Sequence, residues 1–284
     1  MSALAVLAFV GHSMAAGGGE VRAKDLDIGS QTTNGATVKC PRGEFATGGG
    51  AVQFGGPNGL RMSQSGPLES RKGWRVDVRN SNFDPRSMRA LAVCSPRRAS
   101  MQLARFNVDP GFVEQGTAGC GRGQRAIGGG VVPAEGSATD LFIKGSGPLD
   151  STGDPALTDD GDKPAQWFGA VANVTNQTRL IVVWVICSRQ SKASISASEF
   201  SVEPNQASER HVKCGSGRQA LSGGVIPVGD PSRMTVQASG PLAASGALED
   251  TRNGGRPREW YGSGVNLNGF ETGPRTFRVL AICE

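Results

Sequence analysis

Three tryptophan–asparagine pairs are the residues whose types and spacing best fit binding chemistry. The asparagine follows the tryptophan by six residues in each pair: Trp74 and Asn80, Trp167 and Asn173, Trp260 and Asn266. On a β-strand this even spacing puts both side chains on one face. An exposed indole beside an amide can stack on a sugar ring and hydrogen-bond its hydroxyls, so these are candidate ligand-binding residues. The competing interpretation is a core tryptophan at a strand start and an asparagine in the following turn.

An acidic insertion before Trp167 is a weak candidate for metal chemistry. It contains the run Asp159-Asp160-Gly161-Asp162. Hard cations prefer such oxygen ligands, but the spacing differs from that of an EF-hand loop, and a solvated acidic loop is the alternative. Asp159 or Asp160 would also serve a secreted hydrolase, because the fold and not the sequence spacing brings paired carboxylates together.

Nucleophilic catalysis finds little support in the sequence. His211 is unrepeated, and it is the one histidine that follows the N-terminal segment. The run from Cys120 to Gly123 resembles a phosphate-binding loop in its glycines, but no Gly-Lys-Ser/Thr follows it and no strand–helix context is expected. We therefore expect a protein that is not an enzyme and has no cofactor.

Six cysteines occur, two in each of three similar stretches. Cysteines at equivalent positions of a repeat should form equivalent bonds, so we expect one disulfide within each unit: Cys40–Cys94, Cys120–Cys187 and Cys214–Cys283. Zinc is the alternative, but no two cysteines lie close enough in sequence for the usual ligand spacing, and histidines are scarce. Disulfides point to an oxidising compartment.

The N-terminal residues 1–16 read as a signal-peptide-like segment. A short apolar run precedes Ser13-Met14-Ala15, although the basic n-region is missing and the first positive charge is Arg22. Together with the cysteines, this segment predicts a secreted, extracellular protein. No apolar run reaches the length of a membrane span.

The sequence is an internal repeat of three homologous units, which we place at 24–97, 98–190 and 191–284. Each unit has a cysteine, a cluster of tiny residues, a Ser-Gly-Pro-Leu motif, a tryptophan, an asparagine and a closing cysteine, in that order. The second and third units carry an insertion between Ser-Gly-Pro-Leu and tryptophan, and the first lacks one. Function often resides on such symmetry-breaking loops.

Strand patterns dominate each unit, and no sustained helical period is present. Arg75 to Arg79 alternates with period two, which predicts that Val76 and Val78 are buried. The run from Leu180 to Ile186 is apolar throughout and includes Trp184, so we expect a central strand covered on both faces. The consecutive glycines predict a bulge or another backbone close by.

We expect an all-β fold in which three homologous antiparallel sheet units, of four to five strands and one sheet each, pack with pseudo-three-fold symmetry as a β-prism. The alternatives are three tandem small β domains and a β-trefoil, although a trefoil prefers shorter repeats. Each small sheet would bury its apolar face against the other two sheets around the axis.

The charge pattern argues against nucleic acid as a partner. The formal net charge is +5, and arginines alternate with acids, as in Arg75, Asp77 and Arg79. Such mixing indicates a solvated face, with at most a mild attraction to anionic surfaces.

The order of cysteine, glycines, Ser-Gly-Pro, tryptophan, asparagine and cysteine resembles secreted actinobacterial repeat proteins of unassigned function, over nearly the whole mature chain. The expected arrangement of three sheets, one for each repeat, resembles the β-prism of vitelline membrane outer layer protein I and of jacalin-type lectins. No residues match the lectin sugar-binding motif, so neither resemblance implies a site residue.

From these patterns we expect a secreted, non-enzymatic protein that binds a surface glycan or envelope polymer. The alternatives are a structural or assembly protein of an extracellular layer and a secreted hydrolase. The oligomeric state and the ligand's identity are not encoded in any recognisable motif.

Overall fold

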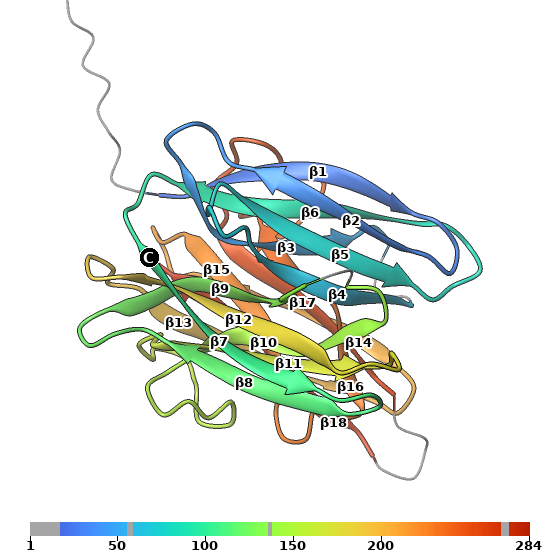
Figure 1. Cartoon of the computed structure of the whole chain (residues 1–284). Coiled ribbons are helices and arrows are strands. Elements are labelled where there is room, and N and C mark those ends of the chain that lie inside the picture. Colours follow the sequence, from blue (N-terminus) through green and yellow to red (C-terminus); the bar gives the residue numbers. More distant parts are fainter. Residues whose placement is uncertain (1–17, 56–58, 136–137, 268–272) are drawn as a thin grey trace, which may run out of the picture.

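The computed structural model describes residues 18–55, 59–135, 138–267 and 273–284. The signal-like segment 1–16 lies outside these residues. Over the described residues the fold is all-β, with eighteen strands and no helix (Figure 1).

Every unit contributes six strands, one or two more than its sequence pattern predicts. The first unit has β1 (Glu20–Ile28), β2 (Thr33–Lys39), β3 (Phe45–Gln53), β4 (Leu60–Pro67), β5 (Gly73–Asn80) and β6 (Arg86–Ser95). The second has β7 (Ser100–Val108), β8 (Val113–Gly119), β9 (Arg125–Pro133), β10 (Leu141–Leu149), β11 (Gln166–Asn173) and β12 (Arg179–Ser188). The third has β13 (Ser194–Val202), β14 (Ala207–Lys213), β15 (Ala220–Pro227), β16 (Met234–Leu242), β17 (Glu259–Asn266) and β18 (Arg275–Cys283). Strand β1 begins before the expected unit start at residue 24.

The strands form three six-stranded antiparallel sheets, and each sheet is shared between two units. The orders are β1-β6-β3-β16-β17-β14, β13-β18-β15-β10-β11-β8 and β2-β5-β4-β9-β12-β7. We call the last one the 2–7 sheet. The expectation of one sheet per unit is therefore wrong, and so is the alternative of tandem domains, because no sheet consists of strands from a single unit. Three-fold, prism-like symmetry is confirmed, since adding six to each strand number converts one sheet order into the next.

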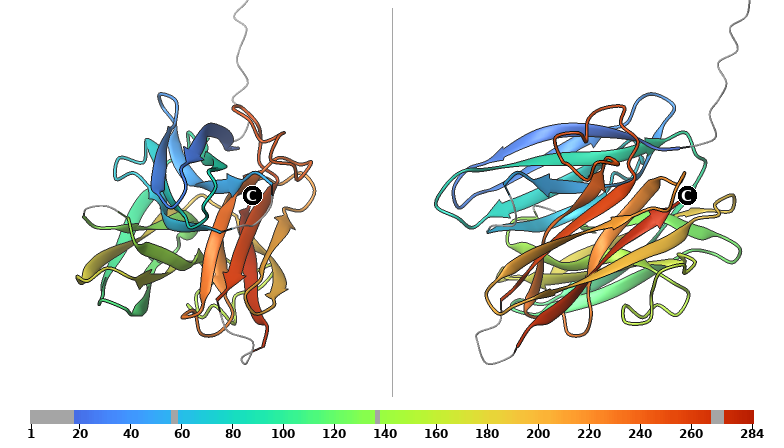
Figure 2. Two further views of the ribbon diagram at one scale, coloured as in Figure 1. Left: turned by 90° about the vertical axis from the view of Figure 1, so that its right-hand side faces the viewer. Right: turned by 180° about the vertical axis from the view of Figure 1, so that it is seen from behind.

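The units surround a common centre. Figure 2 shows them as blue-to-cyan, green-to-yellow and orange-to-red sectors. The first two strands of a unit lie side by side at a corner of the prism but belong to different sheets, as β1 and β2 do. Residues from all three units, such as Val76, Val183 and Val279, belong to one continuous buried core. The predicted burial of Val76 and Val78 is confirmed.

The glycine clusters lie where two units meet. The last glycine of each cluster, Gly50, Gly130 or Gly224, faces the serine carbonyl of a Ser-Gly-Pro-Leu motif in another unit. A Cβ atom on Gly50 would lie 1.8 Å from the carbonyl oxygen of Ser239. A β-bulge interrupts each strand just before the glycines. Both predictions for the clusters, a bulge and a close backbone, are confirmed, and the contact joins the half-sheets of different units.

All three predicted disulfides are present. The Cα–Cα distances are 5.5 Å for Cys40–Cys94, 5.6 Å for Cys120–Cys187 and 5.5 Å for Cys214–Cys283. They lie at one end of the prism, which we call the disulfide end. The turns at the opposite end, such as that between β1 and β2, form what we call the far end.

Candidate functional site

The repeated tryptophans are core residues. Trp74, Trp167 and Trp260 are 1%, 1% and 0% exposed. Each indole Nε1–H donates to the serine hydroxyl of its own unit's Ser-Gly-Pro-Leu motif: Ser65 at 2.9 Å, Ser146 at 3.0 Å and Ser239 at 2.9 Å. The rings and these serines enclose a central cavity of about 10 Å³, room for one water molecule at most.

The repeated asparagines are also buried, at 0% exposed each. The side-chain amide of Asn173 donates to the carbonyls of Val108 at 2.8 Å and Gln177 at 2.7 Å, which ties the β11–β12 loop to the end of β7. Asn80 and Asn266 donate to the equivalent carbonyls of Ile28 and Val202. Their amides satisfy backbone groups at the far end of the prism.

These six side chains therefore cannot form the sugar-stacking faces that their spacing suggests. A ring with 1% or less exposed surface has no face to offer a ligand, and the amides are occupied by loop carbonyls. The competing interpretation, a core tryptophan and a turn asparagine, describes the structure.

We expect Ser146→Ala to lower the free energy of unfolding by about 2 kcal/mol. The substitution leaves the indole N–H of Trp167 buried without an acceptor, and an unmet buried donor costs about 1–3 kcal/mol. Denaturant unfolding measures the change. Ser151→Ala, at an exposed loop position, is the control, and equal stability of the two variants would contradict this role for the serine.

The acidic insertion, residues 150–165, covers the outer face of its sheet. Its Gly161 N–H donates to the Ile195 carbonyl at 2.9 Å, and the Ile195 N–H donates to the Asp162 carbonyl at 2.8 Å. The side chains Leu149, Phe168 and Leu280 form a small second core on that face. The insertion therefore acts as an added edge beside β13.

The geometry gives the cation hypothesis for Asp159, Asp160 and Asp162 no support. A carboxylate oxygen of Asp162 accepts the Asp159 N–H at 2.7 Å, and one of Asp159 accepts the Asp160 N–H at 2.7 Å. In the described ranges no group of three or more His, Cys, Asp or Glu side chains could hold a metal ion.

The insertion of the third unit, residues 243–258, covers a second sheet in the same way. The Val21 N–H donates to the Gly255 carbonyl at 2.8 Å, and the Gly254 N–H donates to the Val21 carbonyl at 2.9 Å. Arg89, on β6, donates to the Leu248 carbonyl at 3.2 Å. Leu91, beside it on the outer face, is 0% exposed.

Among the described residues the 2–7 sheet has no such cover, because the first unit has only a short turn between Leu68 and Gly73. Counting back from the closing cysteine, Trp184 occupies the position of Leu91 and Leu280. Both leucines are fully buried, whereas Trp184 is partly exposed. The expected central strand covered on both faces is thus wrong for β12. It is second from an edge, and its outer face is open.

A groove of about 220 Å³ lies on this open face. Its apolar lining includes Leu68, Val132 and Trp184, and its polar lining consists of Gln64, Glu69 and Arg75. The Arg75 guanidinium is paired with Asp77, at 2.8 Å, and is thereby held over the sheet. An aromatic face with polar groups around it is a common arrangement in ligand sites.

The groove was missed at the sequence level although two signals pointed to it. Trp184 is the one tryptophan without a counterpart in the other units, and the first unit is the one without an insertion. Only the sheet pairing shows that these two exceptions meet, since Trp184 belongs to the second unit and the short turn to the first.

A second depression of about 210 Å³ surrounds His211 at the edge of the third unit's insertion. His211 Nδ1 lies 3.5 Å from a carboxylate oxygen of Glu259, whose other oxygen lies 3.2 Å from Lys213 Nζ. Burial and the carboxylate of Glu209, which accepts the Tyr261 hydroxyl at 2.5 Å, raise the pKa of Tyr261. Glu259 is buried and paired with Lys213, so its negative charge is compensated within the cluster.

No family model and no curated protein matches the chain. The resemblance to secreted repeat proteins therefore rests on the motifs alone. None of the described segments forms a helix with the length and hydropathy needed to cross a membrane. Three disulfides indicate an extracellular or otherwise oxidising environment.

Proposed function

We propose that this chain is a secreted, non-enzymatic protein that binds a surface glycan or envelope polymer in the groove of the 2–7 sheet. The observation that carries the proposal is the partly exposed Trp184, on an outer sheet face that no insertion covers in the part of the chain that the structure describes. In the other two sheets the equivalent leucines lie under protein loops. An external polymer chain could therefore lie on this sheet where an insertion lies on each of the other two sheets.

The chemistry of the groove suits a sugar chain. A pyranose ring presents one apolar C–H face, which an indole covers, and hydroxyls at its rim, which amides, carboxylates and guanidinium groups bond. Gln64, Glu69 and Arg75 provide one of each beside Trp184. Secretion is supported by the oxidised cysteines and by the signal-like start of the sequence.

A structural or assembly role is the second candidate, and exposed apolar residues at the far end favour it. Phe83 is 84% exposed, Phe112 62% and Val174 57%. Isolated exposed apolar residues are common, however, whereas the groove combines an aromatic platform with convergent polar groups. A hydrolase gains no support from Asp159 or Asp160, because the Asp159 carboxylate accepts the Asp160 N–H and the Asp160 carboxylate accepts the Ala197 N–H of β13.

Trp184→Ala is expected to weaken binding to the preferred polysaccharide by about tenfold or more, since truncating a tryptophan that anchors an interface typically costs about 2 kcal/mol or more. A screen of insoluble polysaccharides with the wild-type protein identifies the ligand, and depletion from solution measures the affinity. Phe112→Ala, at an exposed aromatic residue away from the groove, is the matched control. The proposal fails if the wild type binds no glycan or if the two variants bind equally.

A further inference from the structure

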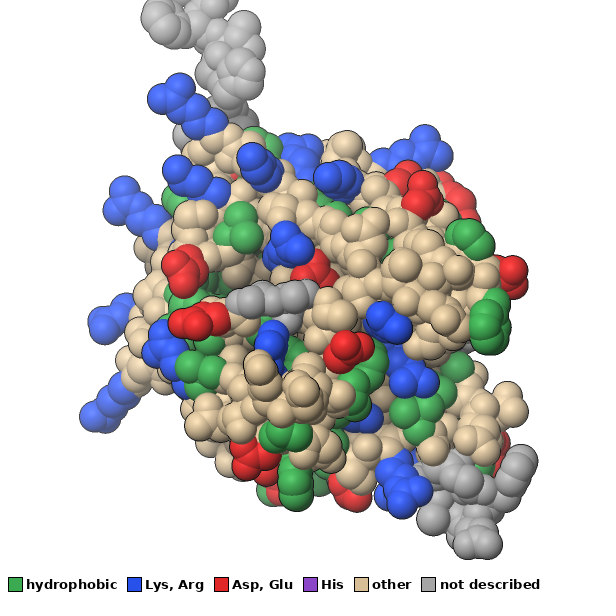
Figure 3. Space-filling model, turned by 45° about the vertical axis from the view of Figure 1, so that its right-hand side comes forward, with side chains coloured by type: hydrophobic (Ala, Val, Ile, Leu, Met, Phe, Trp, Pro, Cys, Tyr) green, Lys and Arg blue, Asp and Glu red, His purple; other side chains and the backbone are tan. Residues whose placement is uncertain are grey.

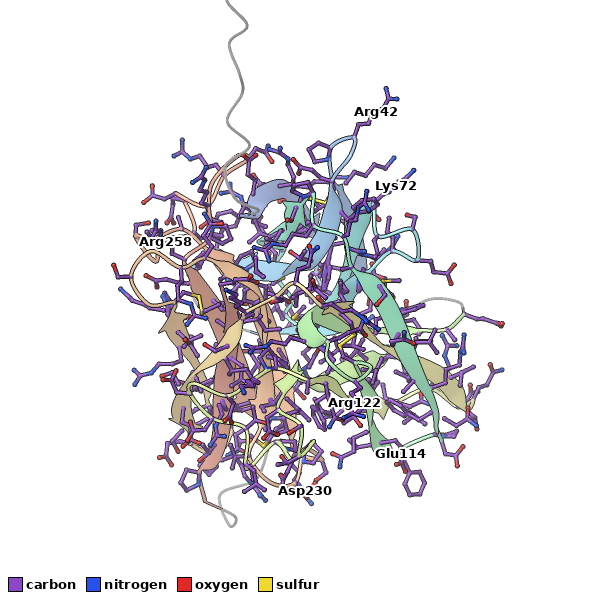
Figure 4. All side chains as sticks on the ribbon, turned by 90° about the vertical axis from the view of Figure 1, so that its left-hand side faces the viewer. Arg42, Lys72, Glu114, Arg122, Asp230 and Arg258 are labelled. Atoms are coloured by element: carbon purple, nitrogen blue, oxygen red, sulfur yellow. A yellow bond between two sulfur atoms is a disulfide. The ribbon has the colours of Figure 1, made fainter. Side chains whose placement is uncertain are left out.

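The two ends of the prism carry opposite charge. Short loops and strand ends at the disulfide end present exposed cations: Arg42, Lys72, Arg98, Arg122, Arg189 and Lys192. Loops at the far end carry more acids than cations: beside the exposed Arg233 they carry Asp84, Asp109, Glu135, Asp140, Glu203 and Asp230. Figure 3 shows several Lys and Arg side chains projecting from the left-hand edge, with others spread over the visible face. Figure 4, which faces that end, shows Arg42, Lys72 and Arg122 on separate loops.

The basic loops are continuous with the groove. The β4–β5 turn lines the groove with Leu68 and Glu69 and then carries Arg71 and Lys72. The Arg71 guanidinium donates to the Ala99 carbonyl at 2.5 Å, which fixes the linker that carries Arg98.

The same linker leads to the β8–β9 turn. Ser100, at the start of β7, accepts a hydrogen bond from the Gln124 side chain at 3.4 Å. Gln124 belongs to the turn that carries Arg122. The path from the floor of the groove to Arg122 thus runs over neighbouring loops that are bonded to one another.

Arg71 adds an uncompensated positive charge where the groove meets the basic loops. It is 8% exposed, lies over the Phe45 ring at 5.0 Å, and has a backbone φ of 56°. Within the described ranges no carboxylate pairs with it, and its Nε and Nη2 atoms have no hydrogen-bond partner. Burial lowers the pKa of its guanidinium, yet arginine remains charged. A buried cation in a low-dielectric setting raises the potential around it.

We propose that the ligand of the groove is an anionic polysaccharide, whose charged groups continue from Trp184 onto Lys72, Arg98 and Arg122. This inference rests on the proposed function and names its ligand class. None of the three cations pairs with a carboxylate in the described part of the chain, so they are free to meet carboxylate or phosphate substituents. The acidic far end repels the same chain, so the polymer leaves the groove towards the disulfide end.

Glu69, on the turn that carries Lys72, partly offsets this field, but the other acids near the path are engaged elsewhere. Glu284 is paired with Arg97 at 2.8 Å and accepts from the Ser191 hydroxyl at 2.7 Å. These contacts outweigh its burial and lower the pKa of its carboxyl. The acids of the β10–β11 insertion lie over β13, where Asp160 accepts from the Ala197 N–H.

The test compares polygalacturonate with its methyl ester, which is the same sugar chain without the charge. We expect the wild type to bind polygalacturonate about tenfold tighter at about 50 mM salt, and to lose most of this advantage at about 500 mM. Lys72→Glu combined with Arg98→Glu and Arg122→Glu should remove the preference but leave ester binding unchanged. Phosphorylated dextran, run in parallel, distinguishes phosphate from carboxylate as the preferred substituent. Circular dichroism confirms that the variant is folded.

The outcomes separate the two proposals. Equal binding of acid and ester, with normal binding by the triple variant, overturns the anionic ligand but leaves the groove proposal standing, provided that Trp184→Ala weakens both. Binding that depends on the three cations but not on Trp184, or that is equalled by duplex DNA, shows a simple charge effect and overturns both. Binding of none of these polysaccharides counts against both.

Discussion

Gly128→Ala is expected to lower the free energy of unfolding by more than about 3 kcal/mol, enough to prevent folding at ordinary temperatures. A Cβ atom on Gly128 would lie 1.6 Å from the backbone carbonyl oxygen of Thr47, which belongs to another unit. A flexible side chain could rotate away from such a contact, but this carbonyl is fixed in its strand. Relief would require the first and second units to separate at the axis.

The control is Gly119→Ala, where the nearest atom to the new Cβ is 3.8 Å away. Both variants add one methyl group to a strand glycine whose φ is not positive, so they differ only in the space around it. Expression yield and thermal unfolding measure the effect. If Gly128→Ala melts within a few degrees of Gly119→Ala, the units do not meet as closely as the structure has them.

Position 128 also shows how the symmetry is broken at the axis. The third unit has Ser222 where the others have Gly48 and Gly128. A Cβ on Gly48 would lie 2.8 Å from the Cβ of Ser222, so one unit can carry a side chain there only because its neighbour carries none. Strict repetition of serine in all three units would overfill the centre.

The repeat made much of the fold predictable from sequence. Cysteines at equivalent places identified their partners, and the alternation around Val76 and Val78 identified a buried strand face. The glycines predicted a close backbone. These features are local or are repeated, so one unit supplies the information for all.

The sharing of sheets could not be predicted in this way. Whether β4 pairs with a strand of its own unit or with β9 of the next is a long-range choice, and both leave the same side chains buried. The repeated tryptophans misled for a related reason. Even spacing places Trp74 and Asn80 on one face, but it does not tell which face meets solvent, and here that face is the inner one.

Lys144 is a buried charge near the axis for which the fold has little compensation. It is 5% exposed and occupies the β-bulge of β10 between Ile143 and Gly145. Its ammonium group donates to the Thr235 hydroxyl at 3.0 Å. Burial, reinforced by repulsion from Arg61 and only partly offset by Asp230, lowers the pKa of Lys144 from 10.5 to about 8.

Lys144→Met is therefore expected to raise the free energy of unfolding at pH 7 by about 2 kcal/mol. The lowered pKa corresponds to a penalty of about 3 kcal/mol for keeping the ammonium charged in the folded state, which the substitution removes. Loss of the hydrogen bond to Thr235 reduces this gain by about 1 kcal/mol. Methionine fills a similar volume and adapts to irregular space. Chemical denaturation of both proteins measures the difference.

The pH dependence distinguishes this electrostatic cause from better packing. Between pH 8 and 10.5 the folded lysine has lost its proton while the unfolded one keeps it, so the unfolded state binds more protons and wild-type stability rises with pH relative to the variant. The advantage of Lys144→Met should shrink steadily across this window. Lys163→Met, at an exposed lysine, should show no such trend. An advantage that stays constant from pH 7 to 10.5 would assign the gain to packing and refute a strained charge at Lys144.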